Sequence, residues 1–452
     1  MNTCVFKIVG LVGLISLPFF SIGQRRSGSD TTNTAARATA AMQRPTSGPR
    51  PYAEVISSKA NTEHGFFKVH KQDDKYYFEI ADSLLGRDIL AVNRIGKAAA
   101  ENRVQTQGYA GDQIGENVLR FEKGPNNKIF LRKISFRESA SDTSDNGMYR
   151  SVINSNLQPI VSAFDIKAIG KDSVTGSRSF VIDVTDFVNG DNDILFFEGN
   201  YKKRLSLAQQ FNDRSYIESI RSFATNIEIR TVKTYNRSGG SSIPMIPGPA
   251  VSGPATYELN SSMVLLPRHP MKARYFDPRV GYFATGYTDF DADPHGVKKI
   301  SMITRWRLEP REEDKAKYLA GELVEPAKQI VFFIDPATPK KWVPYLIQGV
   351  NDWNVAFEKA GWKNAIIARE APATDPKWSI DDARHSAIVY KPSDIPNASG
   401  PHVHDPRSGE ILETHVNWYH NVMSLLRNWY FVQAAAVDPK ARTMKFEAEL
   451  MG

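Results

Sequence analysis

The stretch Gln329-Ile330-Val331-Phe332-Phe333-Ile334-Asp335-Pro336-Ala337-Thr338-Pro339 joins a continuous apolar run to turn-forming and helix-starting residues. Its first part has the length and composition of a strand buried on both faces. Asp335 is a suitable N-cap, and proline is favoured at the first helical position because it has no N–H to leave unsatisfied. We therefore expect a buried strand over 329–334 and a helix that begins directly after it.

The residues after this turn repeat apolar side chains at helical spacing. The repeat covers about five turns, and Gly361 is placed to end the helix. Two short apolar runs, 365–368 and 386–390, would form strands beside 329–334. The sequence thus predicts a strand–helix–strand–strand unit in which the helix covers one face of the sheet. The apolar helical positions are Trp342, Leu346, Gly349, Val350, Trp353, Phe357 and Ala360.

The residues upstream predict mainly strands. Apolar patterns at 65–70 and 75–80 flank the turn 72–74, and further strand patterns cover 89–95, 117–122, 128–135, 180–184, 227–235 and 256–266. The last two flank Ser238–Pro254, which we expect to be a hairpin loop and not a domain linker. The best helical patterns here are 163–169 and 214–223. The predicted fold class is α+β, with β-rich domains followed by an α/β unit.

The segment from Tyr275 to Asp293 is dense in aromatic and turn-forming residues. Two interpretations compete: a cation site or cleft loop that uses Asp289, Asp291 and Asp293, or a packed connection between domains. The segment lacks the glycine and glutamate of a calcium-binding loop. We therefore expect a packed, hydrogen-bonded connection.

The N-terminus has the pattern of an export signal. Lys7 precedes an apolar run from Ile8 to Phe20, which is too short for a spanning helix and is interrupted by Pro18. We expect cleavage near Gly23-Gln24, an exported protein without a stable membrane anchor, and a disordered leader over 24–51. The only cysteine, Cys4, leaves with the signal, which excludes disulfides and thiolate chemistry in the mature chain.

The net charge of +7 invites a nucleic-acid interpretation, but the location of the charge argues against it. Residues 24–50 carry +4, whereas residues 51–452 keep a balance of only +2. A surface that follows phosphates is therefore not expected, and we predict no nucleic-acid partner.

The last quarter holds the remaining candidate site residues. Residues 410–418 alternate in character, which suggests an exposed edge strand able to pair with an extended polypeptide, unless a loop covers that edge. The candidate substrate-binding residues are Thr414, His415, Val416, Asn417 and Trp418. His402 and His404 are two apart, so both imidazoles would point one way on a strand. They are weak metal candidates, with solvated or cleft-lining histidines as the alternative, because no third ligand has a fitting spacing.

Several long blocks carry a family resemblance: Tyr76-Tyr77-Phe78-Glu79-Ile80-Ala81-Asp82-Ser83-Leu84-Leu85-Gly86-Arg87, Tyr275 to Asp293, and Asp335 to His420. With the signal and leader, they resemble exported bacterial zinc-dependent metallopeptidases of the metzincin-like kind. The resemblance implies a signal over 1–23, a leader over 24–51, a small β-rich domain over 52–100, a larger mainly β domain over 101–326, and the N-terminal part of a zincin-like catalytic domain over 327–452.

The zinc signature of that family is missing from this sequence. No H-E-x-x-H occurs between Met1 and Gly452. The resemblance places the ligands and the general base after a segment similar to 421–452, where Leu425, Trp429, Val432 and Ala436 suggest a helix. We expect a truncated chain without catalytic residues or zinc of its own, and with exposed apolar surface near its end. The full-length parent would hydrolyse peptide bonds with zinc-bound water. The alternative is a secreted, noncatalytic β-rich binding or adhesion protein.

Overall fold

The computed structural model describes residues 48–100, 107–172, 176–237 and 252–442. The signal predicted over 1–23, nearly all of the predicted leader, and residues 238–251 of the predicted hairpin loop lie outside these ranges. No helix in the described ranges is both long and apolar enough to cross a membrane.

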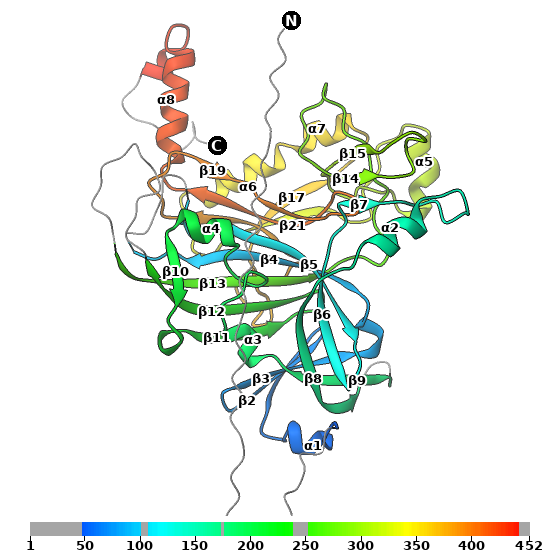
Figure 1. The fold of residues 1–452 in the computed structure, drawn as a ribbon. Coiled ribbons are helices and arrows are strands. Elements are labelled where there is room, and N and C mark those ends of the chain that lie inside the picture. The colour runs from blue at the N-terminus through cyan, green and yellow to red at the C-terminus, as the bar shows by residue number, and fades with distance from the viewer. Residues whose placement is uncertain (1–47, 101–106, 173–175, 238–251, 443–452) are drawn as a thin grey trace, which may run out of the picture. The chain divides into compact units, whose positions relative to one another are not determined.

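Twelve strands form one long antiparallel sheet in the order β1-β2-β3-β9-β8-β6-β5-β4-β13-β12-β10, with β11 also paired to β12 (Figure 1). The strands are β1 (Asn61–His64), β2 (Lys68–Gln72), β3 (Lys75–Ala81), β4 (Asp88–Lys97), β5 (Gln113–Lys123), β6 (Lys128–Ile134), β8 (Ile160–Lys171), β9 (Arg178–Asp183), β10 (Leu207–Gln210), β11 (Tyr216–Ser222), β12 (Asn226–Arg237) and β13 (Gly253–Leu265). Strands of the two predicted β units pair with one another here, because β3 pairs with β9 and β4 with β5 and β13. The two units therefore share one hydrogen-bonded framework.

Residues with positive φ make the tight connections in this sheet. Asp73 has φ 53° between β2 and β3, and Asn126 and Asn127 both have φ 54° between β5 and β6. Asparagine and aspartate tolerate this conformation better than other residues that carry a side chain. Strands β12 and β13 pair from Asn226–Val264 to Arg237–Gly253, which confirms the predicted hairpin.

Two predicted helices are wrong. Residues 163–169 lie in β8, which pairs with β6 and β9, and residues 214–223 contain β11, which pairs with β12. In both places the neighbouring strands supply backbone partners over most of the segment, and this pairing overrides the local helical pattern.

Aromatic rings fill the core of the long sheet. The Phe67 ring lies 5.8 Å from Phe78 and 5.6 Å from Phe121, measured between centroids. All three residues are at most 2% exposed. Each such ring contributes roughly 1.5–3 kcal/mol through burial, so truncating one to alanine would open a cavity in this layer.

A separate three-stranded sheet has the order β15-β14-β7 and consists of β7 (Glu138–Ser139), β14 (Ala284–Asp289) and β15 (Lys298–Ile303). The Asp291 carboxylate accepts hydrogen bonds from the backbone N–H groups of Ser141, Asp142 and Met148 at 2.6, 2.7 and 2.9 Å. Asp289 accepts from the N–H of Asp291 at 2.9 Å. These bonds confirm the hydrogen-bonded part of the predicted connection. The expected packing is not found, because Tyr275 and Phe283 of the same segment are 73% and 78% exposed.

The α/β unit has a sheet of the order β17-β16-β18-β21-β19, and β20 also pairs with β21. Strands β16 (Ile330–Ile334), β17 (Ile366–Glu370), β18 (Ser386–Lys391) and β21 (Glu410–Tyr419) are parallel, whereas β19 (Ala398–Ser399) and β20 (His402–Asp405) run antiparallel to β21. The three strands predicted from apolar runs are confirmed. The fold is thus a β-rich α+β fold.

The predicted backing helix starts later and is broken. It forms α6 (Val343–Asn351) and α7 (Asn354–Lys359), and Pro344, not Pro339, occupies the first helical turn. Trp342, Leu346, Val350 and Phe357 pack on the sheet as predicted. Trp353 lies in the break, directly before α7, and is 62% exposed instead of buried. Gly361 ends α7 with φ 93°, as expected of a C-terminal glycine.

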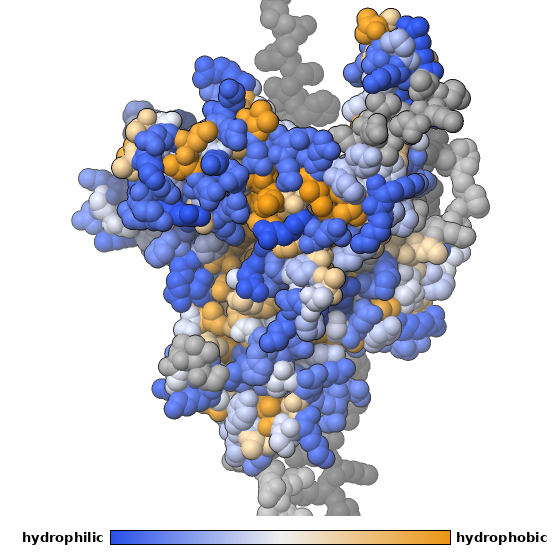
Figure 2. Space-filling view, turned by 180° about the vertical axis from the view of Figure 1, so that it is seen from behind, coloured by the Kyte–Doolittle hydropathy of each residue, from blue (hydrophilic) through white to orange (hydrophobic). Residues whose placement is uncertain are grey.

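The remaining helices are short apart from the last one. They are α1 (Tyr52–Val55), α2 (Tyr149–Ser155), α3 (Thr185–Asn189), α4 (Gly199–Arg204), α5 (Lys315–Leu319) and α8 (Val422–Ala434). The helix expected near the end of the chain is α8, which projects from the body in Figure 1. Trp429, Phe431 and Val432 are exposed on it. Figure 2 shows hydrophobic residues across the upper half of the rear face as well, in line with the predicted exposed apolar surface.

The two sheets contact each other through a small apolar cluster. Ala383 and Val403 of the α/β unit pack against Leu90, Val92 and Val264 of the long sheet. In Figure 1 the α/β sheet lies above β4 and β13, with α6 and α7 on its far side. Next to this cluster the contact becomes polar, and the candidate site lies there.

Candidate functional site

Strand β21 places the predicted substrate-binding residues on two opposite faces. Val416 and Trp418 point into the core beneath α6 and α7. His415 and Asn417 line a pocket on the other face, together with Glu413. Thr414 is buried, and its hydroxyl donates to the Pro401 carbonyl. The five residues therefore do not form one common binding surface.

The prediction of an exposed edge at Thr414–Trp418 is wrong. Strand β21 pairs with β18 on one side. On its other side, β19 pairs with Asn417 and Trp418, and β20 pairs with residues from Glu410 to Thr414. The chain after Pro396 folds back along β21 and takes up the backbone groups that an added peptide would need. The outer position belongs instead to residues 398–405.

His402 and His404 lie side by side on β20, with ring centroids 5.1 Å apart. This confirms that both rings point the same way. Burial lowers the pKa of both side chains, which keeps them neutral. His404 Nδ1 is buried without a hydrogen-bond partner in the described residues. No group of three or more metal-binding side chains occurs in the described ranges, so the two histidines have no third ligand beside them there.

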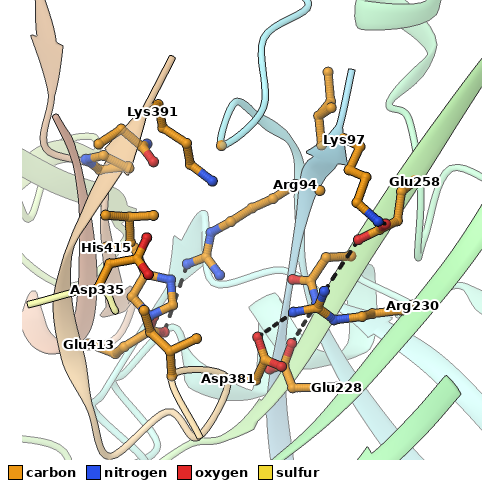
Figure 3. A pocket seen from close by; sticks show the side chains of 18 residues that line it. Arg94, Lys97, Glu228, Arg230, Glu258, Asp335, Asp381, Lys391, Glu413 and His415 are labelled. Atoms are coloured by element: carbon orange, nitrogen blue, oxygen red, sulfur yellow. Dashed lines mark hydrogen bonds and ion pairs between the residues drawn. The ribbon is translucent and has the colours of Figure 1, made fainter. Parts of the chain in front are cut away.

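A charged pocket of about 270 Å³ lies between the long sheet and the α/β sheet (Figure 3). Strands β4, β12 and β13 supply its first wall, with Arg94, Glu228 and Glu258 among the lining residues. Strands β18 and β21 supply the second wall, which includes Lys391 and His415. The pocket therefore exists only because the two sheets meet.

One side of the charged pocket is a chain of paired charges. Lys97 forms an ion pair with Glu258, which also lies 3.2 Å from Arg230. Arg230 reaches across the boundary between the sheets and donates to Asp381 at 2.7 Å. Four charges are thus neutralised in sequence, and they fix this side of the pocket.

The other side holds ionisable groups with few partners. Arg94 Nη2 lies 3.8 Å from Glu413, too far for a hydrogen bond, and Arg94 Nε has no partner in the described ranges. In those ranges the Lys391 ammonium makes no hydrogen bond and has no carboxylate within 4.0 Å, and burial lowers its pKa. Among the same residues, the Asp335 carboxylate accepts only from the Ala337 N–H, at 3.0 Å. In Figure 3, Arg94 and Lys391 reach into the same part of the pocket from opposite walls.

Two further side chains of the charged pocket, Glu228 and His415, have shifted pKa values. Burial raises the pKa of Glu228 to about 7, and the nearby Asp381 carboxylate acts in the same direction. The side-chain amides of Asn226 and Asn260 each donate to Glu228 at 2.7 Å. Burial lowers the pKa of His415. Its Nε2 lies 3.0 Å from Glu413 without the alignment of a hydrogen bond.

Sequence reasoning identifies His415 and Asn417 but not the other residues of this pocket. Arg94, Glu228 and Lys391 come from strands that lie far apart in the chain. The available signal is the presence of charged residues inside strands with otherwise apolar patterns, as at Glu228 and Arg230. That signal indicates a polar layer, but it does not show which strands face one another.

The comparisons with known proteins match the two β-rich stretches. Residues 49–98 match a family model described as a domain of unknown function, DUF5118, and residues 111–311 match another, DUF5117. No curated protein and no solved structure matches the chain. Arg94 lies in the first matched stretch and Glu228 in the second, whereas Lys391 and His415 lie outside both.

Proposed function

We propose that this chain is the polypeptide-binding part of an exported zinc-dependent metallopeptidase, in which residues 327–452 begin the catalytic domain. One observation supports this best. The four parallel strands β17-β16-β18-β21, backed by α6 and α7 on one face, end in the antiparallel strands β19 and β20. An outer antiparallel strand of this kind can pair with an extended substrate backbone.

The described residues do not supply the zinc site of such an enzyme. They contain no cluster of three metal-binding side chains. The family resemblance assigns the ligands and the general base to H-E-x-x-H, which does not occur in this sequence. The role of this chain's own residues in the proposal is therefore to hold the substrate.

An extended polypeptide would pair as a new strand with the segment 398–405. Beyond β21, neither β19 nor β20 has a further strand partner in the described ranges. Gly400 lies between them and is exposed, and a Cβ added to it would meet no described atom within 4 Å. The Ala398 N–H and the Pro401 carbonyl already have side-chain partners, Asn397 and Thr414. An added strand would therefore pair mainly with the backbone at Gly400, and side-chain contacts on either side would set specificity.

A pair of variants at Gly400 tests the binding mode. G400P removes the backbone N–H between β19 and β20, whereas G400A keeps it, and a Cβ at this position has room. Binding of a fluorescein-labelled peptide of alternating valine and threonine, measured by anisotropy, should weaken about tenfold or more in G400P and stay unchanged in G400A. Equal affinity of all three proteins would contradict strand addition.

The catalytic part of the proposal is tested on the product of the complete reading frame that contains this chain. We expect that frame to encode H-E-x-x-H after Gly452, and its product to cleave a denatured protein substrate in a reaction that a zinc chelator stops. A frame that closes directly after Gly452, combined with normal peptide binding, would instead favour the secreted noncatalytic binding protein.

A further inference from the structure

The charged pocket holds three charged side chains without a close ion pair. Arg94 has carboxylates around it, with Glu413 at 3.8 Å and Glu228 nearby, but its Nε has no hydrogen-bond partner in the described ranges. Lys391 has no carboxylate within 4.0 Å in those ranges. Asp335 has no cation within 4.0 Å in those ranges. Buried charges are costly unless they are paired. The neighbouring residues Lys97, Glu258, Arg230 and Asp381 form a chain of ion pairs. The groups that lack such close partners therefore suggest that a charged ligand binds beside them.

We propose that the charged pocket binds a small zwitterion of dipeptide size, with its carboxylate between Arg94 and Lys391 and its ammonium group toward Asp335. The proposal does not depend on the polypeptide-binding strand or on zinc. It concerns a pocket on the opposite face of β21 from the α6 and α7 core, which includes Pro401 of the segment 398–405 in its lining but not Gly400.

Size and charge both favour this class of ligand. A cavity of about 270 Å³ suits a ligand of a few heavy groups, such as a dipeptide, but not a folded segment. Arginine binds carboxylates through two parallel N–H groups, and lysine adds a point charge. The two cations together therefore suit one carboxylate.

The acidic residues of the pocket argue against a phosphate. Glu413 and Asp335 line the same cavity as Arg94 and Lys391, and they would repel a dianion. A ligand that carries its own ammonium group converts the repulsion by Asp335 into attraction, and Glu413 repels its single negative charge less than it would repel a dianion. The Asn417 amide, also in the lining, adds a neutral donor and acceptor for a peptide group.

Isothermal titration calorimetry on the full chain tests this assignment with four probes: alanyl-alanine, N-acetyl-alanyl-alanine, alanyl-alanine amide and inorganic phosphate. We expect alanyl-alanine to bind with a Kd below about 1 mM. Blocking either end should weaken binding about tenfold or more, because a charge of the pocket is then left without its partner. Phosphate should not compete.

Variants then assign each end of the ligand. K391M should weaken alanyl-alanine binding about tenfold or more. The exposed K340M is the matched control and should bind normally. D335N keeps the oxygen that accepts from the Ala337 N–H, and it should weaken alanyl-alanine binding without changing the affinity for the N-acetylated probe.

The thermal melting temperature of each variant without ligand shows whether a loss of binding comes from unfolding. K391M should remain folded, because it removes a half-buried cation that has no close partner in the described ranges. The proposal is overturned if alanyl-alanine does not bind to the wild-type chain, if phosphate binds in its place, or if folded K391M binds the dipeptide as well as wild type does.

Discussion

Glu79 shows how one buried charge can organise a whole corner of the long sheet. Its carboxylate accepts hydrogen bonds from Ser179 at 2.6 Å, Tyr52 at 2.7 Å and Lys68 at 2.9 Å, and it lies 3.0 Å from His70 Nε2. Burial alone would raise the pKa of Glu79, but these partners outweigh it and lower the pKa to about 2. The folded protein therefore stabilises the ionised Glu79 carboxylate.

The Glu79 carboxylate should make stability depend on pH in the acid range. A carboxyl group with a lowered pKa in the folded state binds fewer protons than in the unfolded state. Its contribution is complete above pH 4.5 and is lost as the pH falls toward 2. The free energy of unfolding, from urea denaturation, should fall by about 3 kcal/mol over this window.

The variant E79Q isolates this effect. It should be less stable at pH 7 by about 3–5 kcal/mol, because buried donors lose their charged acceptor. It should also lose most of the acid dependence. E218Q, at an exposed position of β11, is the control and should follow wild type. Parallel curves for E79Q and wild type between pH 5 and 2 would contradict this role.

At the scale of elements, two asparagines attach the broken helix to its sheet. Asn354 Nδ2 donates to the Ile366 carbonyl at 2.8 Å, and its Oδ1 accepts from the Ile366 N–H at 3.3 Å. Asn351 Oδ1 accepts from the Ala368 N–H at 3.0 Å. Strand β17 lies at the end of its sheet, so these side chains satisfy backbone groups that have no strand partner.

Removing one of these amides should loosen β17 selectively. N354A leaves the N–H and the carbonyl of Ile366 without partners and should lower the free energy of unfolding by about 2 kcal/mol. V355A, at an exposed neighbouring position, should change it by less than about 0.5 kcal/mol. Hydrogen exchange of the Ile366 amide should quicken in N354A. Unchanged protection would mean that packing alone holds this strand.

These elements also show what the sequence can and cannot predict. Strands β16, β17 and β18 are predictable because each is a local apolar run with turn residues on both sides. The break between α6 and α7 is not, because the hydrogen bonds of Asn351 and Asn354 reach a strand that lies later in the chain. The edge assignment of β21 is wrong for the same reason, since alternation gives the faces of a strand but not its neighbours. The charged pocket depends on how two sheets meet, which no single segment encodes.

At the scale of the whole molecule, Asn226 joins the long sheet to the α/β unit. This residue is fully buried at the start of β12. Its Nδ2 donates to the Asp381 carbonyl at 2.8 Å, and its Oδ1 accepts from the Ala383 N–H at 3.0 Å. Arg230 adds its ion pair to the Asp381 side chain. Because the described residues also belong to one compact unit that begins at Gly48, we expect the two sheets to unfold together.

The distribution of tryptophan makes this coupling measurable. All seven tryptophans lie between Trp306 and Trp429, so fluorescence reports on the C-terminal part, whereas far-ultraviolet circular dichroism is dominated by the long sheet. In wild type the two probes should give one coincident urea transition. In N226A, the loss of these buried hydrogen bonds should cost about 2–4 kcal/mol and separate the transitions, with the fluorescence change at lower urea. N61A, at an exposed position of β1, should keep them coincident. Separate transitions in wild type would show that the sheets are independent, and coincident transitions in a destabilised N226A would show that other contacts couple them.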